Sequence, residues 1–154
     1  MIANIRRKFW LAMLPLLCFS LFILVVPYST AQTPKSGKLT VKITGVRNTE
    51  GNIRVALRTD DNTIVDAKVV EIDPKALTAE AVFDNVAAGN YGVAVIHDEN
   101  KNEKLDFNDA GMPVEGYGHS NNPAKRPGPP DFGETKFALA APGSSIEIAL
   151  IYWP

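Results

Sequence analysis

Apolar and polar residues alternate along much of the chain. In residues 38–46, KLTVKITGV, the apolar positions are Leu39, Val41 and Ile43, and residues 53–59, IRVALRT, repeat the pattern. A period of two places successive side chains on opposite faces of an extended chain, so each segment predicts a half-buried β-strand. The same reasoning predicts five further strands, at residues 64–72, 79–86, 91–98, 134–140 and 145–153.

Turn-forming residues separate these segments, and no amphipathic helix of useful length is evident. Gly51 lies in RNTEGN, Pro74 follows the third segment, and AAGN precedes the most apolar one, YGVAVIHD. About seven short strands separated by turns predict an all-β domain, an antiparallel β-sandwich. The phrase FDNVAAGNYGVAVIHDEN resembles the prealbumin-like sandwich of carboxypeptidase regulatory domains, and Tyr91 within it is expected to be a core aromatic or to fix the turn through its hydroxyl.

Residues 98–133 do not alternate and predict one long irregular loop. The first half carries apolar residues such as Leu105 and Phe107, whereas the second half, NNPAKRPGPPDF, has the composition of a mobile or polyproline segment. A connection of this length inside a compact domain usually has a function or is disordered.

The N-terminal segment has the organisation of a secretory signal peptide. Arg6, Arg7 and Lys8 precede an apolar run over residues 9–26, and PYSTAQ then supplies small residues for cleavage after Ala31. Residues 1–31 are therefore expected to be a signal peptide, residues 32–37 a linker, and residues 38–154 the sandwich. The apolar run is long enough that an uncleaved membrane anchor is the alternative. Lipid attachment is disfavoured, because no small residue precedes Cys18 and apolar residues follow it.

Removal of the signal peptide changes the charge and the cysteine content of the chain. It takes away three basic residues and no acid, so the formal net charge falls from −1 to −4, and the only cysteine is lost. The acidic balance disfavours nucleic acid or an anionic membrane surface as a partner. The domain must then be stabilised by core burial, with or without a metal ion, rather than by disulfides.

The sequence HDENKNEKLDFND predicts a calcium-binding loop. Counted from residue 98, oxygen-bearing side chains stand at positions 1, 3, 5, 9 and 12, position 7 offers a backbone carbonyl, and position 8 is apolar. Calcium takes six to eight oxygen ligands from loops with this spacing. The candidate ligands are Asp98, Asn100, Asn102, Lys104 (through its carbonyl), Asp106 and Asp109. We expect such an ion to have a structural role, in ordering the long loop.

Two positions depart from that spacing pattern, and a second interpretation stays open. Glu103 stands where the bend favours Gly, and Asp109 is shorter than the usual bidentate Glu. The alternative is a solvated polar turn, because Asp and Asn are favoured in turns by local hydrogen bonding alone.

The two histidines, His97 and His119, flank the long loop, and with a carboxylate they offer a zinc or copper site. Their separation along the chain carries no spacing signal, and structural hydrogen bonding is the alternative role. Strand alternation places His97 on the face opposite to Asp98. Ser120 lies beside His119, but adjacent residues rarely point at each other, and no catalytic motif is present.

Four ordered motifs, DENKNEKLDFN, GMPVEGYGHSNN, GPPDFGETKFAL and IEIALIYW, resemble the bacterial exported family called domain of unknown function 2141. The resemblance covers residues 39–153 and implies export and a small β-sandwich, but no activity or substrate. The family's usual loop has Gly at the position of Glu103, and an aromatic residue is common at the position of His119.

The sequence therefore predicts a periplasmic or secreted, non-enzymatic binding or structural module with a calcium-ordered loop and a protein or glycan partner in the cell envelope. Contact with the membrane is expected only through an uncleaved signal segment. The alternative functions are a metal-dependent enzyme or zinc or copper carrier that uses His97 and His119, and a purely structural envelope component.

Overall fold

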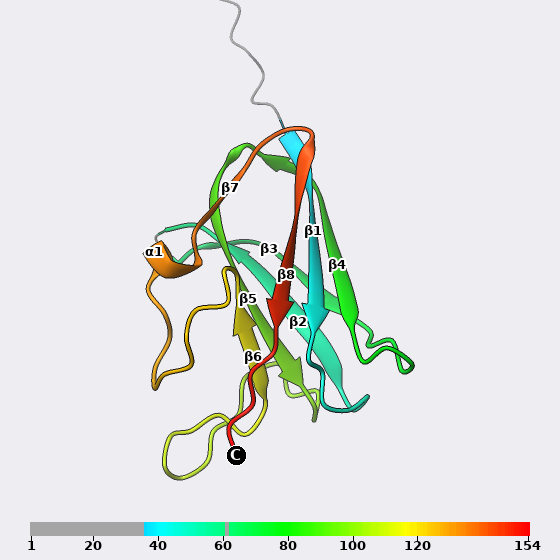
Figure 1. Cartoon of the computed structure of the whole chain (residues 1–154), viewed down its shortest axis with the longest axis vertical. Coiled ribbons are helices and arrows are strands. Elements are labelled where there is room, and N and C mark those ends of the chain that lie inside the picture. The colour runs from blue at the N-terminus through cyan, green and yellow to red at the C-terminus, as the bar shows by residue number, and fades with distance from the viewer. Residues whose placement is uncertain (1–35, 61) are drawn as a thin grey trace, which may run out of the picture. The chain divides into compact units, whose positions relative to one another are not determined.

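The computed structural model describes residues 36–60 and 62–154, which form two packed β-sheets (Figure 1). The expected signal peptide and most of the expected linker lie outside the described residues. No helix in the described part of the chain has the length and apolar character needed to cross a membrane.

The smaller sheet has three strands in the order β4 (Ala79–Ala87), β1 (Ser36–Thr44), β8 (Gly143–Ala149). β1 begins within the segment expected to be a linker. It pairs antiparallel with β4 and parallel with β8, so this sheet is mixed rather than purely antiparallel.

The larger sheet has five strands. Its path runs β3 (Ile64–Val70), β2 (Asn52–Arg58), β5 (Gly89–Asp98), β6 (Gly116–His119), and β7 (Phe137–Leu139) pairs with the other end of β5. One short helix, α1 (Phe132–Thr135), precedes β7. All pairings in this sheet are antiparallel.

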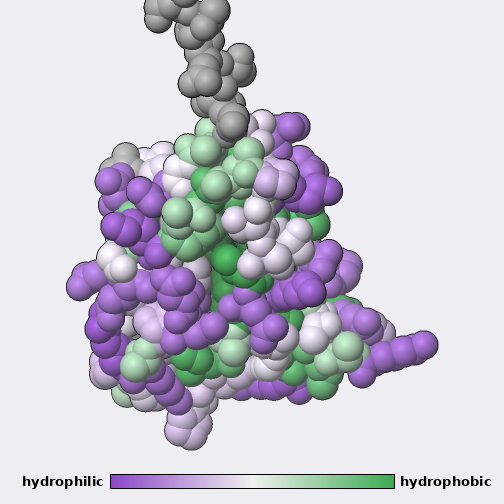
Figure 2. All heavy atoms as spheres, turned by 45° about the horizontal axis from the view of Figure 1, so that its top comes forward, coloured by the Kyte–Doolittle hydropathy of each residue, from purple (hydrophilic) through white to green (hydrophobic). Residues whose placement is uncertain are grey.

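The alternating apolar residues face inward from both sheets and form the core. Residues such as Leu39, Val55, Phe83 and Ile148 are fully or almost fully buried between the sheets, and burial of such side chains is the main stabilising term of a domain that has no disulfide. The space-filling view shows hydrophilic side chains over the flanks of one face and apolar ones in a central band (Figure 2). Every residue of this core lies at or after Leu39, so a protein that begins at Gln32 includes the complete core.

The long connection between residues 98 and 133 is more ordered than its sequence suggests. It contains strand β6, which the alternation rule misses because both inward positions are glycines. A Cβ on Gly116 would lie 2.4 Å from the ring of Tyr152, and one on Gly118 would lie 2.6 Å from Ile148. The strand therefore needs glycine at these positions, because the C-terminal segment packs directly against its backbone.

Candidate functional site

The oxygen-rich loop begins at the buried end of β5. The Asp98 side chain is fully buried, and its carboxylate accepts the backbone N–H groups of Asn102 (2.9 Å) and Glu103 (2.8 Å). The guanidinium of Arg54 on β2 lies 3.9 Å from the same carboxylate. Asp98 thus folds the following residues back over the end of its own strand.

Two residues of this loop adopt left-handed backbone conformations. Lys101 has φ 61° and Glu103 has φ 72°. The second value explains why glycine is expected at this point of such a loop, because a side chain disfavours positive φ. The Glu103 carboxylate lies 3.6 Å from the guanidinium of Arg54, an ion pair that a glycine there would not form.

Three side chains of the loop converge beyond this bend. The side-chain amides of Asn100 and Asn102 both donate to the same carboxylate oxygen of Asp106, over 2.6 and 2.8 Å. The two amide oxygens accept the N–H groups of Asn102 and Lys104. The Lys104 ammonium lies 4.0 Å from Asp106. A compact group of side-chain oxygens therefore lies at the surface, one turn away from the buried Asp98.

The sixth predicted ligand does not join this group. Asp109 is exposed and lies in a separate turn, in which Asn108 accepts the N–H groups of Ala110 and Met112. No hydrogen bond or ion pair links Asp109 to Asp106 among the residues that the structure describes. Of the six predicted ligands, the structure brings the side chains of Asn100, Asn102 and Asp106 together. The Asp98 carboxylate instead accepts backbone N–H groups, and at Lys104 it is the N–H group that contacts the Asn102 side chain. Within the described ranges, no cluster of three or more His, Cys, Asp or Glu side chains has an arrangement suited to a metal ion.

Glu115, which no pattern in the sequence marks as a site residue, fixes both ends of this loop. It is 4 % exposed, and its two carboxylate oxygens accept the N–H groups of Glu99 (2.9 Å) and Asp106 (3.1 Å). The signal in the sequence was weak, because a single Glu between Val114 and Gly116 has no spacing relation to the Asp/Asn pattern.

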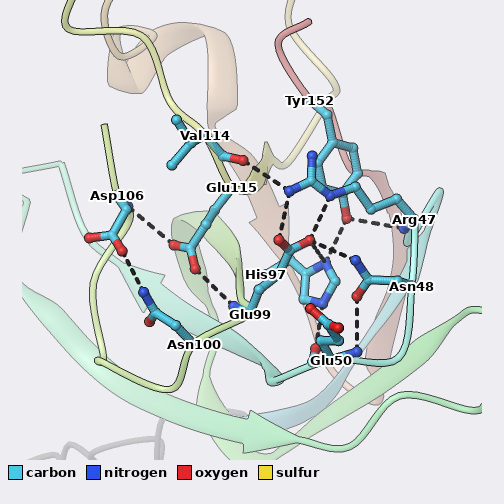
Figure 3. Close-up of polar contacts among 10 residues, drawn as sticks. All are labelled: Arg47, Asn48, Glu50, His97, Glu99, Asn100, Asp106, Val114, Glu115 and Tyr152. Carbon is cyan, nitrogen blue, oxygen red and sulfur yellow. Dashed lines mark hydrogen bonds and ion pairs between the residues drawn. The ribbon is translucent and has the colours of Figure 1, made fainter. Parts of the chain in front are cut away.

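A second polar network attaches the same loop to the core (Figure 3). Arg47 makes a two-point ion pair with Glu99, with both N–O distances 2.6 Å, and also donates to the Val114 carbonyl. The hydrogen bond from Arg47 is the main cause of a lowered pKa of the Glu99 carboxyl. Burial raises the pKa of the neighbouring Tyr152 hydroxyl.

The two histidines lie on opposite faces of the larger sheet. His97 is fully buried on the inner face, opposite Ile53, and its Nε2 donates to the Glu50 carbonyl while Nδ1 contacts the Tyr152 hydroxyl, both over 2.8 Å. His119 pairs with Ala94 on the outer face. The arrangement therefore does not bring the two imidazoles to a common ion.

Ser120 has a structural contact set. Its buried hydroxyl donates to the Thr135 carbonyl and accepts the N–H of Val93, so it links β5 to the end of α1. A hydroxyl held between two backbone groups in this way is not paired with a general base.

The outer face of the larger sheet carries a groove with a volume of about 320 Å³. Its floor is formed by β5 and β6, and its walls by residues 105–113 of the oxygen-rich loop and residues 126–129 of the segment before α1. In Figure 1 these two segments lie beside β6, the first in yellow-green and the second in orange. This volume lies at the lower end of the range of volumes found for small-molecule binding sites.

The comparisons with known proteins give one match. No curated protein and no solved structure matches the chain. Residues 41–147, which include all strands from β2 to β7, match a family described as "Uncharacterized protein conserved in bacteria (DUF2141)". Because this match spans more than half of the sequence, the chain belongs to the DUF2141 family.

Proposed function

We propose that the protein is an exported, non-enzymatic binding module whose loop 98–106 is ordered by calcium. The observation that carries this proposal is the convergence of the Asn100 and Asn102 side chains on Asp106, at the foot of the buried Asp98. The residues from 98 to 109 carry five acids and two lysines, so a bound cation would relieve the repulsion among the carboxylates.

The chemistry of the group suits a hard cation. Calcium prefers carboxylate, amide and backbone carbonyl oxygens in flexible arrangements, and this loop offers all three kinds. Each amide oxygen accepts one N–H group and keeps a second lone pair. Calcium binding requires the two amides to turn their oxygens toward the ion, in exchange for their hydrogen bonds to Asp106.

The expected consequence of calcium is order in the wall of the groove. Leu105 and Phe107 follow the oxygen group directly along the chain and line the groove. The loop is attached to the sheet mainly through polar contacts of Glu99 and Glu115. An ion that fixes Asp106 would therefore also fix the position of the apolar wall.

The non-enzymatic part of the proposal is supported by the structural roles of His97 and Ser120. Both nitrogens of His97 are engaged inside the domain, and the Ser120 hydroxyl lies between backbone groups. Export remains part of the proposal because of residues 1–31, and an N-terminus at Gln32 in the protein recovered from cells would support it.

Thermal unfolding of residues 32–154 tests the calcium site. With calcium at about 100 times its Kd, a ligand specific to the folded state stabilises it by about 2.7 kcal/mol, so the Tm rises relative to chelator. Asp106→Asn is expected to remove most of this rise. Asp109→Asn makes the same charge change in the same loop and is expected to keep it. Equal melting curves in calcium and in chelator would show that the folded domain does not bind calcium and would contradict this part of the proposal.

A further inference from the structure

One end of the groove on the outer face carries an imidazole, that of His119, which the described part of the protein leaves without a hydrogen bond. His119 on β6 contacts the ring of Tyr117 edge-on, with 6.2 Å between the centroids. In the described part of the chain its imidazole makes no hydrogen bond. A half-buried imidazole in this situation has a donor and an acceptor available for a ligand.

Arg58 does not line the groove, but its positive charge acts on His119, which does. Arg58 lies on β2 and is on the same outer face as Ala56, two residues before it. Ala56 pairs with Ala94 of β5, and Ala94 pairs with His119 of β6. The Nε of Arg58 is buried and has no hydrogen-bond partner. No carboxylate in the described ranges forms an ion pair with it. Burial, and secondly the charge of Arg58, lower the pKa of His119 to about 4, so the imidazole is neutral at pH 7 and Arg58 carries the charge.

The rest of the groove is apolar and rich in rings. Phe107 is 58 % exposed, although it is a large apolar side chain, and it lines one wall with Met112. Pro127 and Pro129 of the second segment and Trp153 near the C-terminus also line the groove. Small-molecule pockets are lined mainly by apolar and aromatic side chains with a few polar groups, and planar rings pack well against such walls.

We propose that this groove binds a small aromatic monocarboxylate, with its ring system between the two walls and its carboxylate bound to His119, near the charge of Arg58. This names the ligand class of the binding module proposed above and rests on that function, but it does not require the calcium ion. The positive charge of Arg58 complements a carboxylate, and the neutral imidazole supplies one N–H donor to it. Arg126 at the groove is already paired with Glu134, so it leaves the other wall without net charge.

Other ligand classes fit the same surface less well. A glycan needs many hydrogen-bonding partners, whereas the groove walls are formed largely by proline and apolar side chains. A phosphate dianion needs several converging donors, whereas the groove lining offers the His119 imidazole and the guanidinium of Arg126, which Glu134 already neutralises. A protein partner that inserts an aromatic side chain would use the apolar walls without the carboxylate end, and the experiment below separates that case.

The test uses residues 32–154 and the imidazole signals of the two histidines, which are the only ones in the chain. The probe is 2-naphthoate, and its neutral amide and acetate are the matched controls. We expect saturable shifts at His119 but not at His97 with 2-naphthoate, binding of the amide weaker by about tenfold, and no shift with acetate. No saturable shift with 2-naphthoate would overturn the proposal. Equal affinity for acid and amide would also overturn it and would favour an inserted side chain of a protein.

Two charge variants locate the carboxylate. Arg58→Gln is expected to lower the affinity for 2-naphthoate to that of the amide while the amide affinity stays constant. Lys38→Gln removes the same charge from β1 in the other sheet, where Lys38 pairs with Asp84, and is expected to change neither affinity. An unchanged acid preference in folded Arg58→Gln would overturn the role of Arg58 in the proposal.

Parallel titrations in calcium and in chelator distinguish this proposal from the calcium site. Binding of 2-naphthoate by a domain that calcium does not stabilise supports the groove and rejects the cation. Calcium stabilisation without 2-naphthoate binding supports the cation and rejects the aromatic carboxylate.

Discussion

Two adjacent residues at the end of β5, His97 and Asp98, belong to two different hydrogen-bond networks, one on each face of the strand. His97 points into the core and reaches Tyr152 and the Glu50 carbonyl, whereas Asp98 accepts the N–H groups of the loop that follows. Because adjacent strand residues face opposite ways, the histidine anchors the C-terminal segment and the aspartate shapes the loop. Both side chains are fully buried, so each depends on its hydrogen bonds for stability.

Replacement of Gly116 by alanine tests the close contact beneath β6. The added Cβ would lie 2.4 Å from the Tyr152 ring and would displace the hydroxyl that contacts His97. We expect the free energy of unfolding to fall by about 2 kcal/mol, as for an overpacked core. Chemical denaturation measures this change. Gly133→Ala is the control, because a Cβ there has no neighbour within 4 Å, and a similar loss in that variant would contradict the packing argument.

His119 predicts a pH dependence of stability in the mildly acidic range. Its pKa falls from the ordinary 6.5 to about 4 in the folded protein, mainly because of burial. The unfolded chain therefore binds this proton at a higher pH than the folded one, and acidification from pH 6.5 toward pH 4 lowers the free energy of unfolding. One proton limits the slope to about 1.4 kcal/mol per pH unit, and partial exposure of the ring reduces the effect.

Urea denaturation of the wild type and of His119→Gln between pH 4.5 and 7 checks this expectation. The variant should lose the part of the slope that belongs to His119. Glu99, whose pKa is lowered below its ordinary 4.5 mainly by Arg47, loses its stabilising contribution only at lower pH. If the free energy of unfolding depends on pH in the same way in the wild type and in His119→Gln between pH 4.5 and 7, the imidazole has the same pKa in the folded and the unfolded protein.

At the scale of elements, the loop between β5 and β6 depends on one carboxylate for its closure. Glu115 accepts the N–H groups of Glu99 and Asp106, which lie at opposite ends of the oxygen-rich turn. Glu115→Ala leaves both groups without their partner, at a cost of about 1–3 kcal/mol for each buried one. We expect the loop to open locally rather than the sandwich to unfold.

Amide hydrogen exchange resolves that local opening. In Glu115→Ala the amides of Glu99 and Asp106 should lose protection, while the amides of β1 and β2 retain theirs. Asp109→Ala, an exposed change in the same loop, should leave all of them protected. Loss of protection throughout the core would instead show that Glu115 supports the entire fold.

The elements also show how far the sequence could predict the structure. Strands such as β1, β2 and β5 have strict alternation and were predicted well, and the two sheets of the sandwich confirm the expected fold class. β6 was missed because its buried positions are glycines, which have no hydrophobic signal. The predicted ligands Asn100, Asn102 and Asp106 do contact one another, because neighbours in one turn must lie close, whereas Asp109 lies in a separate turn. Arg47 and Glu115 were not recognised, since their contacts join segments distant in the chain.

At the scale of the whole molecule, the oxygen-rich loop and the groove share one structural element. Asp106 belongs to the candidate calcium group, whereas Leu105 and Phe107 on either side of it line the groove. An ion that holds Asp106 therefore favours the arrangement in which the apolar wall is formed. A ligand between the walls favours the same arrangement, so the two binding events should support each other.

This coupling has a quantitative form that calorimetry can measure. We expect calcium to tighten the binding of 2-naphthoate by about fivefold or more, and 2-naphthoate to tighten calcium binding by the same factor, because linkage is reciprocal. Asp106→Asn should abolish the coupling without changing the 2-naphthoate affinity measured in chelator, since the groove itself keeps all its lining residues. If calcium and 2-naphthoate both bind but with a coupling factor of one, then Phe107 and Leu105 occupy the same positions with and without the ion. In that case the polar anchors Glu99 and Glu115, rather than calcium, determine the shape of the wall.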